Sequence, residues 1–137
     1  SEKSLNGLND RVMALLQRVD LAQFARVHAG ELAYGRKRTL EIATTLAMEP
    51  ELMLLDEPTS GMGHEDVGHV QALIKEAAAG RTVLMVEHNM SVVSGICDTI
   101  TVMARGAVLA EGPYSAISRN PQVIEAYMGS AEAGAHG

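Results

Sequence analysis

One stretch, from Leu52 to Pro58, limits the fold of this chain more than any other. Four apolar residues, 52–55, lead directly into Asp56, Glu57 and Pro58. A run this short and without polar alternation predicts a strand buried on both faces, as in a parallel sheet. Proline ends the strand, so Asp56 and Glu57 should lie at its carboxyl end, where open α/β sheets bind ligands. Burying unpaired carboxylates is costly. The pair therefore indicates a chemical site, unless the strand simply surfaces in an acidic turn.

A second apolar run, residues 82–86, predicts another buried strand, which ends in Glu87-His88. Apolar residues at helical spacing predict a helix over about 65–79 between the two strands, closed by Gly80. Strand, helix and strand then form a βαβ unit whose strands end at the same edge of the sheet. His88 is therefore expected near Asp56 and Glu57. A single histidine is more often structural than catalytic, but this position favours a ligand shared with the carboxylates.

The rest of the chain predicts three more helices and a strand pair. A tight turn is indicated by Arg105-Gly106, and a helix start by Asn120 followed by proline. A frayed, Gly- and Ala-rich tail should begin at Gly129. The predicted elements are helices over 9–19 and 36–48, strands over 99–104 and 107–111, and a last helix from Pro121 to about Met128.

Composition excludes several classes of function. The 137 residues suit one domain, and 47% hydrophobic with 20% charged residues allow a packed core. A net charge of −6 and only 3% aromatic residues argue against nucleic-acid binding, which needs a basic face and usually stacking platforms. The single Cys97 fits a reducing cytoplasm. No apolar stretch approaches the roughly 18 residues of a membrane span, so a membrane role would need a partner. Because the chain begins with Ser, we expect an excised or processed piece.

Three cations, Arg36, Lys37 and Arg38, fall in the first turn of the predicted helix over 36–48. The helix dipole favours anions there, so this placement is unusual. Free backbone N–H groups together with positive charge form an anion site suited to phosphate, and Gly35 would let a ligand approach the backbone closely. The alternative is that these side chains extend into solvent.

Taken in order, these segments resemble the ATP-binding subunit of ABC transporters, over essentially residues 8–128. The resemblance implies a P-loop NTPase-like α/β fold, with a parallel sheet, flanking helices and part of the family's helical subdomain. The end of the chain, from Asn120-Pro121 to Gly129, looks most like branched-chain amino acid importers. The matching motifs are a signature loop (Leu32, Ala33, Tyr34, Gly35, Arg36), a Walker B strand ending at Asp56, the following Glu57, a D-loop (Ser60, Gly61, Met62, Gly63) and the switch His88.

The resemblance also implies a role for each of these residues. Asp56 would hold Mg²⁺ through water, because this ion keeps much of its hydration. Glu57 would polarise the attacking water as a general base, and His88 would contact the γ-phosphate of ATP. The signature loop would close over ATP held by a second ATP-binding subunit, in a homo- or heterodimer.

The chain departs from the family pattern in four places, one of which is the absence of the glutamine loop that normally precedes the family's helical region. It contains no Gly-x-x-x-x-Gly-Lys-[Ser/Thr], so the Walker A loop that cradles the phosphates is missing. Ala33 replaces the usual signature serine, which removes a hydroxyl that would bond the γ-phosphate. Gly63 stands where the D-loop usually has aspartate, which weakens any role in communication across a dimer.

The missing motif predicts an incomplete domain, the C-terminal half of a nucleotide-binding domain. Residues 1–50 would be part of the helical subdomain, 51–128 the C-terminal part of the ATPase core, and 129–137 a flexible tail. The family's Walker A strand lies between the strand ending at His88 and the strand over 99–104, so its absence would leave unpaired edges. We expect the chain to close this gap by local rearrangement or to associate with a second copy.

The function implied is that of the ATPase subunit of a branched-chain amino acid importer, cytoplasmic and attached to the inner face of the membrane through permease subunits. This chain alone is expected neither to bind nor to hydrolyse ATP. An alternative is a non-catalytic dimerisation module that supplies only a signature loop. A third class, soluble ABC proteins of translation or DNA repair, is disfavoured by the compact motif spacing and the net charge of −6.

Overall fold

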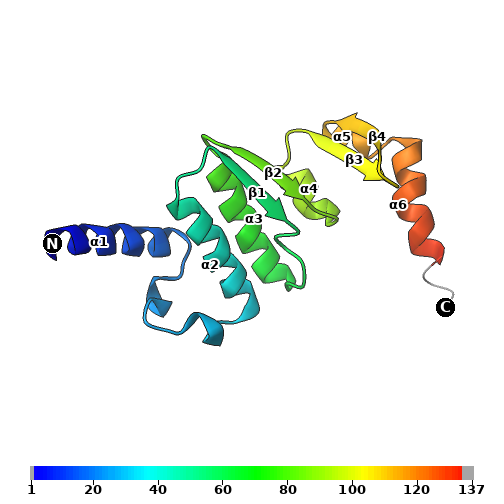
Figure 1. Cartoon of the computed structure of the whole chain (residues 1–137). Coiled ribbons are helices and arrows are strands. Elements are labelled where there is room, and N and C mark those ends of the chain that lie inside the picture. Colours follow the sequence, from blue (N-terminus) through cyan, green and yellow to red (C-terminus); the bar gives the residue numbers. More distant parts are fainter. Residues whose placement is uncertain (1, 134–137) are drawn as a thin grey trace. The chain divides into compact units, whose positions relative to one another are not determined.

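The structure is a computed structural model that describes the backbone of residues 2–133 and the side-chain burial of residues 5–127 (Figure 1). Its contacts fall into two compact units, one ending at His88 and one beginning at Asn89. Each unit is described by itself below.

The first unit holds the predicted βαβ arrangement and two preceding helices. The helix predicted over 9–19 is longer, because α1 begins at Glu2. Gly80, which follows the C-cap Ala79 of the unit's last helix, adopts a φ of 100°, as expected of a glycine that ends a helix. The elements are α1 (Glu2–Arg18), the single-turn η1 (Ala22–Phe24) and η2 (Ala29–Glu31), α2 (Tyr34–Ala47), β1 (Leu52–Asp56), α3 (His64–Ala78) and β2 (Thr82–Val86).

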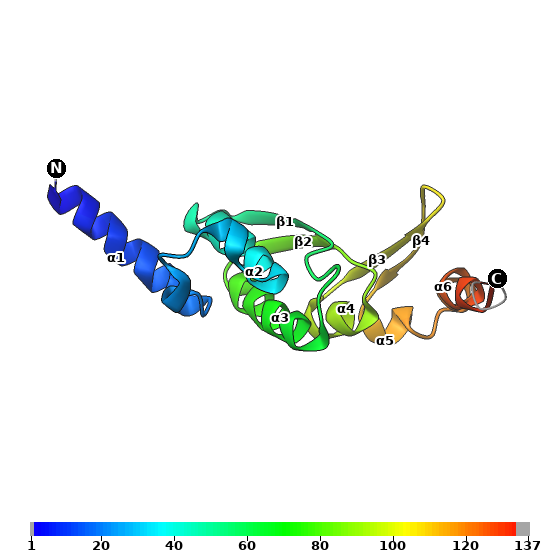
Figure 2. The ribbon, with the colours of Figure 1, turned by 90° about the horizontal axis from the view of Figure 1, so that it is seen from below.

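Strands β1 and β2 are parallel and in register from Leu52 opposite Thr82 to Asp56 opposite Val86. Both strands therefore end at the same edge, as the sequence predicted. Helices α2 and α3 cover one face of this sheet (Figures 1 and 2). Met53, only 1% exposed, points into the core beneath them. Other buried core residues of this unit are Val19, Ile42, Leu46, Val70, Leu73 and Ile74.

The prediction that both faces of these strands are buried is wrong for this chain. Leu54 and Leu84, opposite each other in the register, are 67% and 62% exposed. Exposure alternates along both strands because side chains point to opposite faces and the helices cover only one. We call the uncovered side the open apolar face; it consists of Leu52, Leu54, Leu84 and Val86.

The second unit is a small hairpin with helices. Arg105 and Gly106 have φ values of 52° and 79°, as the predicted tight turn requires. Asn120 Oδ1 accepts a hydrogen bond from Gln122 N (2.9 Å) and so caps the last helix. The core of the second unit is formed by Val102, Ile117 and Val123. The elements are α4 (Met90–Ile96), β3 (Ile100–Ala104), β4 (Ala107–Gly112), α5 (Tyr114–Ile117) and α6 (Pro121–Ala133).

The strands of the two units form separate sheets. β1 pairs with β2, and β3 pairs antiparallel with β4, each in a two-stranded sheet. Within residues 2–133, no third strand joins either sheet. Helix α6 continues to Ala133, into the stretch expected to be a flexible tail, and residues 134–137 lie outside the described residues.

Candidate functional site

The structure brings Glu57 and His88 together at the carboxyl edge of β1 and β2. The Oε1 atom of Glu57 lies 3.4 Å from Nδ1 of His88. Both side chains remain accessible, with 47% and 65% of their surfaces exposed. An accessible carboxylate beside an imidazole can take a proton from water or orient a water molecule. The expectation that these two residues converge is met by the parallel register.

The backbone of Glu57 has an unusual conformation. Its φ is 43°, in the left-handed region that residues other than glycine rarely adopt. The N–H of Glu57 donates to Val86 O at 2.8 Å, which extends the pairing of the strands by one residue. Its carbonyl accepts from Ser60 N at 3.1 Å, so the chain turns back immediately. Backbone outliers of this kind are concentrated at functional sites.

Glu87 was not singled out from the sequence, yet its carboxylate contacts Thr59, close to Glu57, and the backbone of His88. Its Oε1 accepts from the backbone N–H of Thr59 (3.3 Å) and from the Thr59 hydroxyl, and its Oε2 accepts from His88 N (2.9 Å). The only sequence signal was its position next to His88. The partner Thr59 is distant in sequence, so the pattern alone does not indicate this contact.

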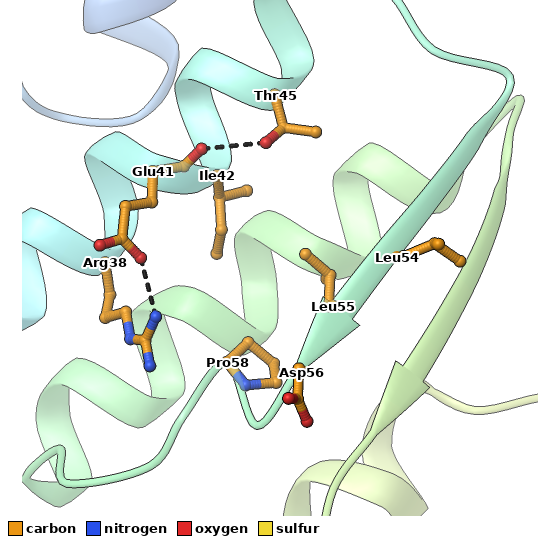
Figure 3. Close-up of a pocket in the computed structure, with 8 residues that line it drawn as sticks. All are labelled: Arg38, Glu41, Ile42, Thr45, Leu54, Leu55, Asp56 and Pro58. Carbon is orange, nitrogen blue, oxygen red and sulfur yellow. Dashed lines mark hydrogen bonds and ion pairs between the residues drawn. The ribbon is translucent and has the colours of Figure 1, made fainter.

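Asp56 lines a cavity of about 270 Å³ between α2 and the edge of β1. Figure 3 shows Asp56 beside Pro58 at the end of the strand, below Leu55. On the opposite wall, Arg38 Nη1 donates to Glu41 Oε2 at 2.8 Å, and the Thr45 hydroxyl donates to the Glu41 carbonyl at 3.1 Å. Among the described residues, no group of three or more His, Cys, Asp or Glu is arranged to hold a metal by itself. A magnesium ion at Asp56 would therefore depend on water and phosphate oxygens for its other ligands.

The signature loop leads into the first turn of α2. Leu32 is buried, and Ala33 occupies the N-cap position with φ −59° and ψ 153°. This residue makes no side-chain cap hydrogen bond, because alanine has no acceptor. Gly35 is buried against α3: a Cβ at this position would lie 2.5 Å from the carboxyl carbon of Asp66. Any larger residue here would therefore force the Asp66 side chain to move.

Two of the three cations at this helix start are held within the chain. The guanidinium of Arg36 lies over the ring of Phe24, 4.3 Å from its centroid. The guanidinium of Arg38 lies 5.9 Å from the ring centroid of Tyr34. Its hydrogen bond to Glu41, with a further contribution from Tyr34, raises the pKa of Arg38 above its ordinary value. These contacts orient positive charge at the helix start rather than leaving it free in solvent.

The D-loop residues form the turn between β1 and α3 and touch the signature loop. Met62 N donates to Thr59 O at 3.3 Å, and Gly61 has a φ of 74°. A Cβ on Gly61 would lie 3.5 Å from the ring of Tyr34, so the signature residue packs over this turn. Gly63 is the N-cap of α3, again without a side-chain cap. The two residues that differ from the family motifs, Ala33 and Gly63, therefore both lie at helix N-caps.

Two protein-family models match the chain. Residues 3–60 match a model described as ABC transporter, and residues 107–133 match one described as branched-chain amino acid ATP-binding cassette transporter. The first match includes the signature loop, β1 and Glu57, and the second includes β4 and all of α6. Both matches agree with the motifs that carried the resemblance.

Curated relatives agree with these models. The chain is 42% identical over 118 residues to the high-affinity branched-chain amino acid transport ATP-binding protein BraF of Pseudomonas aeruginosa, covering 85% of the chain and 46% of that protein. It is 40% identical over 124 residues to LivG of Escherichia coli, which has the same description, covering 89% of the chain and 49% of LivG. The chain thus spans about half the length of the curated relatives it matches.

Solved structures share the fold. An ATP-binding cassette of an ABC transporter in its ADP conformation matches with a TM-score of 0.79 and 28% identity, over 88% of this chain and 49% of that one. A nucleotide-free cassette matches with a TM-score of 0.78 and 27% identity, over 86% and 49%. In the described part of the chain, no helix has the length and apolar character to cross a membrane. The chain belongs to the ABC transporter family, in which it resembles the branched-chain amino acid ATP-binding proteins.

Proposed function

We propose that this chain is the C-terminal half of the ATPase subunit of an importer for branched-chain amino acids. The observation that carries the proposal is the Glu57–His88 pair, 3.4 Å apart at the carboxyl edge of β1 and β2. The names of the relatives support the substrate class. In this proposal, residues 1–50 belong to the helical subdomain, 51–128 to the ATPase core and 129–137 to a tail.

The residues of the pair divide the chemistry between them. Glu57 accepts a hydrogen bond from the attacking water and takes its proton as a general base. His88 contacts the γ-phosphate and is oriented by the neighbouring Glu57 carboxylate. Asp56 is exposed at the strand end and would bind a magnesium ion through water. The bound ion would neutralise charge on the phosphates. The 137 residues contain no phosphate-cradling Walker A loop, so the chain carries only half of a site.

The partners follow from this assignment. The signature loop from Leu32 to Arg36 serves ATP held by a second ATP-binding subunit, and the D-loop from Ser60 to Gly63 lies beside it. The subunit acts in the cytoplasm, on the inner face of the cell membrane, through permease subunits. No nucleic acid is a partner, in line with the net charge of −6.

The test is ATP hydrolysis by the intact subunit, meaning this chain preceded by a Walker A half. Glu57→Gln should lower kcat by on the order of 10²–10⁴-fold, the usual contribution of a general base. The matched control is Glu125→Gln on the exposed surface of α6, which should leave turnover unchanged. An intact subunit with full activity in Glu57→Gln would refute the assignment of the base. Loss of branched-chain amino acid uptake on deletion of the gene tests the substrate class.

The chain alone is expected to behave differently. Without a phosphate cradle, it should not bind ATP at micromolar concentrations and should not turn it over. Calorimetric titration of ATP and Mg²⁺ into the 137-residue chain measures this directly. Hydrolysis by the chain alone that disappears in Glu57→Gln would contradict the expectation.

The second candidate function, a non-catalytic dimerisation module, is favoured by the open apolar face. Leu54 and Leu84 lie at its centre, and β1 and β2 each have an edge that pairs with no strand among the described residues. A second copy would present the same face and edges, as an isologous dimer requires. Sedimentation should then report a dimer that Leu54→Lys dissociates. The control Met48→Lys, at a residue 74% exposed outside this face, should not change the mass. A monomer at all concentrations would exclude self-association.

A further inference from the structure

The Glu87 carboxylate lies beside the Glu57–His88 pair and contacts the chain at both strand ends. It follows β2 directly and accepts hydrogen bonds from Thr59 N, from the Thr59 hydroxyl and from His88 N. Thr59 is 5% exposed, so its hydroxyl is removed from water and depends on this acceptor. Because one carboxylate accepts from groups on both sides, it links the two strand ends.

On the β1 side, this link holds the turn that carries Glu57. Thr59 lies inside the turn closed by the hydrogen bond from Ser60 N to Glu57 O at 3.1 Å. Glu57 itself has a φ of 43°, which is unfavourable for a residue with a side chain. Such a conformation persists only when surrounding contacts enforce it. By binding both the amide and the hydroxyl of Thr59, Glu87 keeps the turn closed and Glu57 in place.

On the β2 side, the same carboxylate fixes His88. Its Oε2 accepts the His88 backbone N–H at 2.9 Å, which sets the direction in which the chain leaves β2. The 3.4 Å between Glu57 Oε1 and His88 Nδ1 therefore depends on the Glu87 side chain, which holds the backbone on both sides of the pair.

We propose that Glu87 is a positioning residue that sets the separation of Glu57 and His88, through Thr59 on one side and the His88 amide on the other. This inference rests on the proposed ATPase function. Glutamine at position 87 has one acceptor oxygen in place of two, and its NH₂ group would face one of the donors. Aspartate is shorter by one methylene, which moves its carboxylate oxygens away from the positions that the Glu87 oxygens occupy. Both substitutions should therefore make the separation of Glu57 and His88 less well defined, while leaving these two residues unchanged.

The first experiment measures turnover and KM for ATP in the intact subunit. Glu87→Gln should lower kcat by about tenfold, since small misplacement of reacting groups costs up to roughly 10²-fold. The KM for ATP should stay within about twofold of wild type, because an interaction needed only in the transition state affects kcat. Thr59→Val, which removes the hydroxyl and keeps the shape, should lower kcat in the same direction.

The matched control is Glu111→Gln in the second unit. Glu111 Oε2 also accepts from a threonine hydroxyl, that of Thr101, at 2.7 Å, but on an exposed hairpin. This variant should change neither constant. Unchanged kcat in Glu87→Gln would overturn the inference, and so would a raised KM at constant kcat.

A second readout does not depend on activity. Hydrogen exchange of the Thr59 and His88 amides is measured on the 137-residue chain, in wild type and in Glu87→Gln. Both amides should exchange faster in the variant, while amides in the middle of α3 stay protected. If the intact wild-type subunit does not hydrolyse ATP, the proposed function fails. The exchange rates of the two amides then test the positioning role of Glu87 by themselves. Equal exchange of both amides in the two proteins would refute it.

Discussion

Replacing Ala33 with serine is expected to stabilise this chain. Ala33 is the N-cap of α2, and its φ of −59° and ψ of 153° already match a capping residue. A serine hydroxyl would accept a hydrogen bond from the N–H of Gly35 or Arg36, the second and third residues of the helix. The first turn of α2 contains no acidic residue that would already stabilise this helix end through the dipole. The serine hydroxyl would therefore add a stabilising interaction that the helix start lacks.

The size of the effect follows from the position. Serine in place of alanine at an N-cap raises the free energy of unfolding by about 0.5–2 kcal/mol. Because Ala33 is exposed, we expect a gain of about 1 kcal/mol. Gly63→Asp at the N-cap of α3 should add only a few tenths of a kcal/mol, since glycine is already a fair cap. The two variants therefore test a ranking, with Ala33→Ser above Gly63→Asp.

Urea unfolding followed by circular dichroism measures both variants. A gain of about 1 kcal/mol should raise the urea midpoint by roughly 0.5 M, with the slope unchanged. Ala72→Ser, at an exposed position inside α3, is the control and should lower stability by about 0.5 kcal/mol, because serine is a poorer helix former. An unchanged or lower midpoint in Ala33→Ser, or equal effects of serine at 33 and 72, would refute the capping argument.

Three further predictions concern packing, backbone strain and a thiol. Gly35→Ala should lower the free energy of unfolding by about 1–3 kcal/mol by overpacking against Asp66, and Asp66→Ala should recover most of the loss in the same urea assay. Glu57→Gly should be about 1 kcal/mol more stable than Glu57→Ala, because glycine tolerates the φ of 43°; equal midpoints would argue against strain at this residue. Burial, and then the charge of Asp98, raise the pKa of the Cys97 thiol, so less thiolate forms at a given pH. Alkylation of Cys97 by iodoacetamide at pH 8 should be slower than that of a free cysteine peptide, and Asp98→Asn should speed it.

Local sequence signals determined where the strands, the tight turn and the helix cap of this protein form. The apolar runs at 52–55 and 82–86 became parallel strands with their acidic ends at one edge, because strand period and chain direction follow from short-range pattern. The Arg105-Gly106 turn and the Asn120 cap were likewise readable, since each depends on the conformational preferences of one or two residues. The proximity of Glu57 and His88 followed from the same register.

Other properties depended on residues far apart in the sequence. An apolar run predicts that a strand can be buried, but only the packing of α2 and α3 decides that Met53 is covered and Leu54 is not. The hydrogen bonds of Glu87 to Thr59 join positions 28 residues apart, and no periodicity relates them. The sequence by itself determined which elements form and which residues end the strands. Tertiary structure decided which face is covered and which carboxylate holds the pair, because burial and hydrogen bonding depend on neighbours in space.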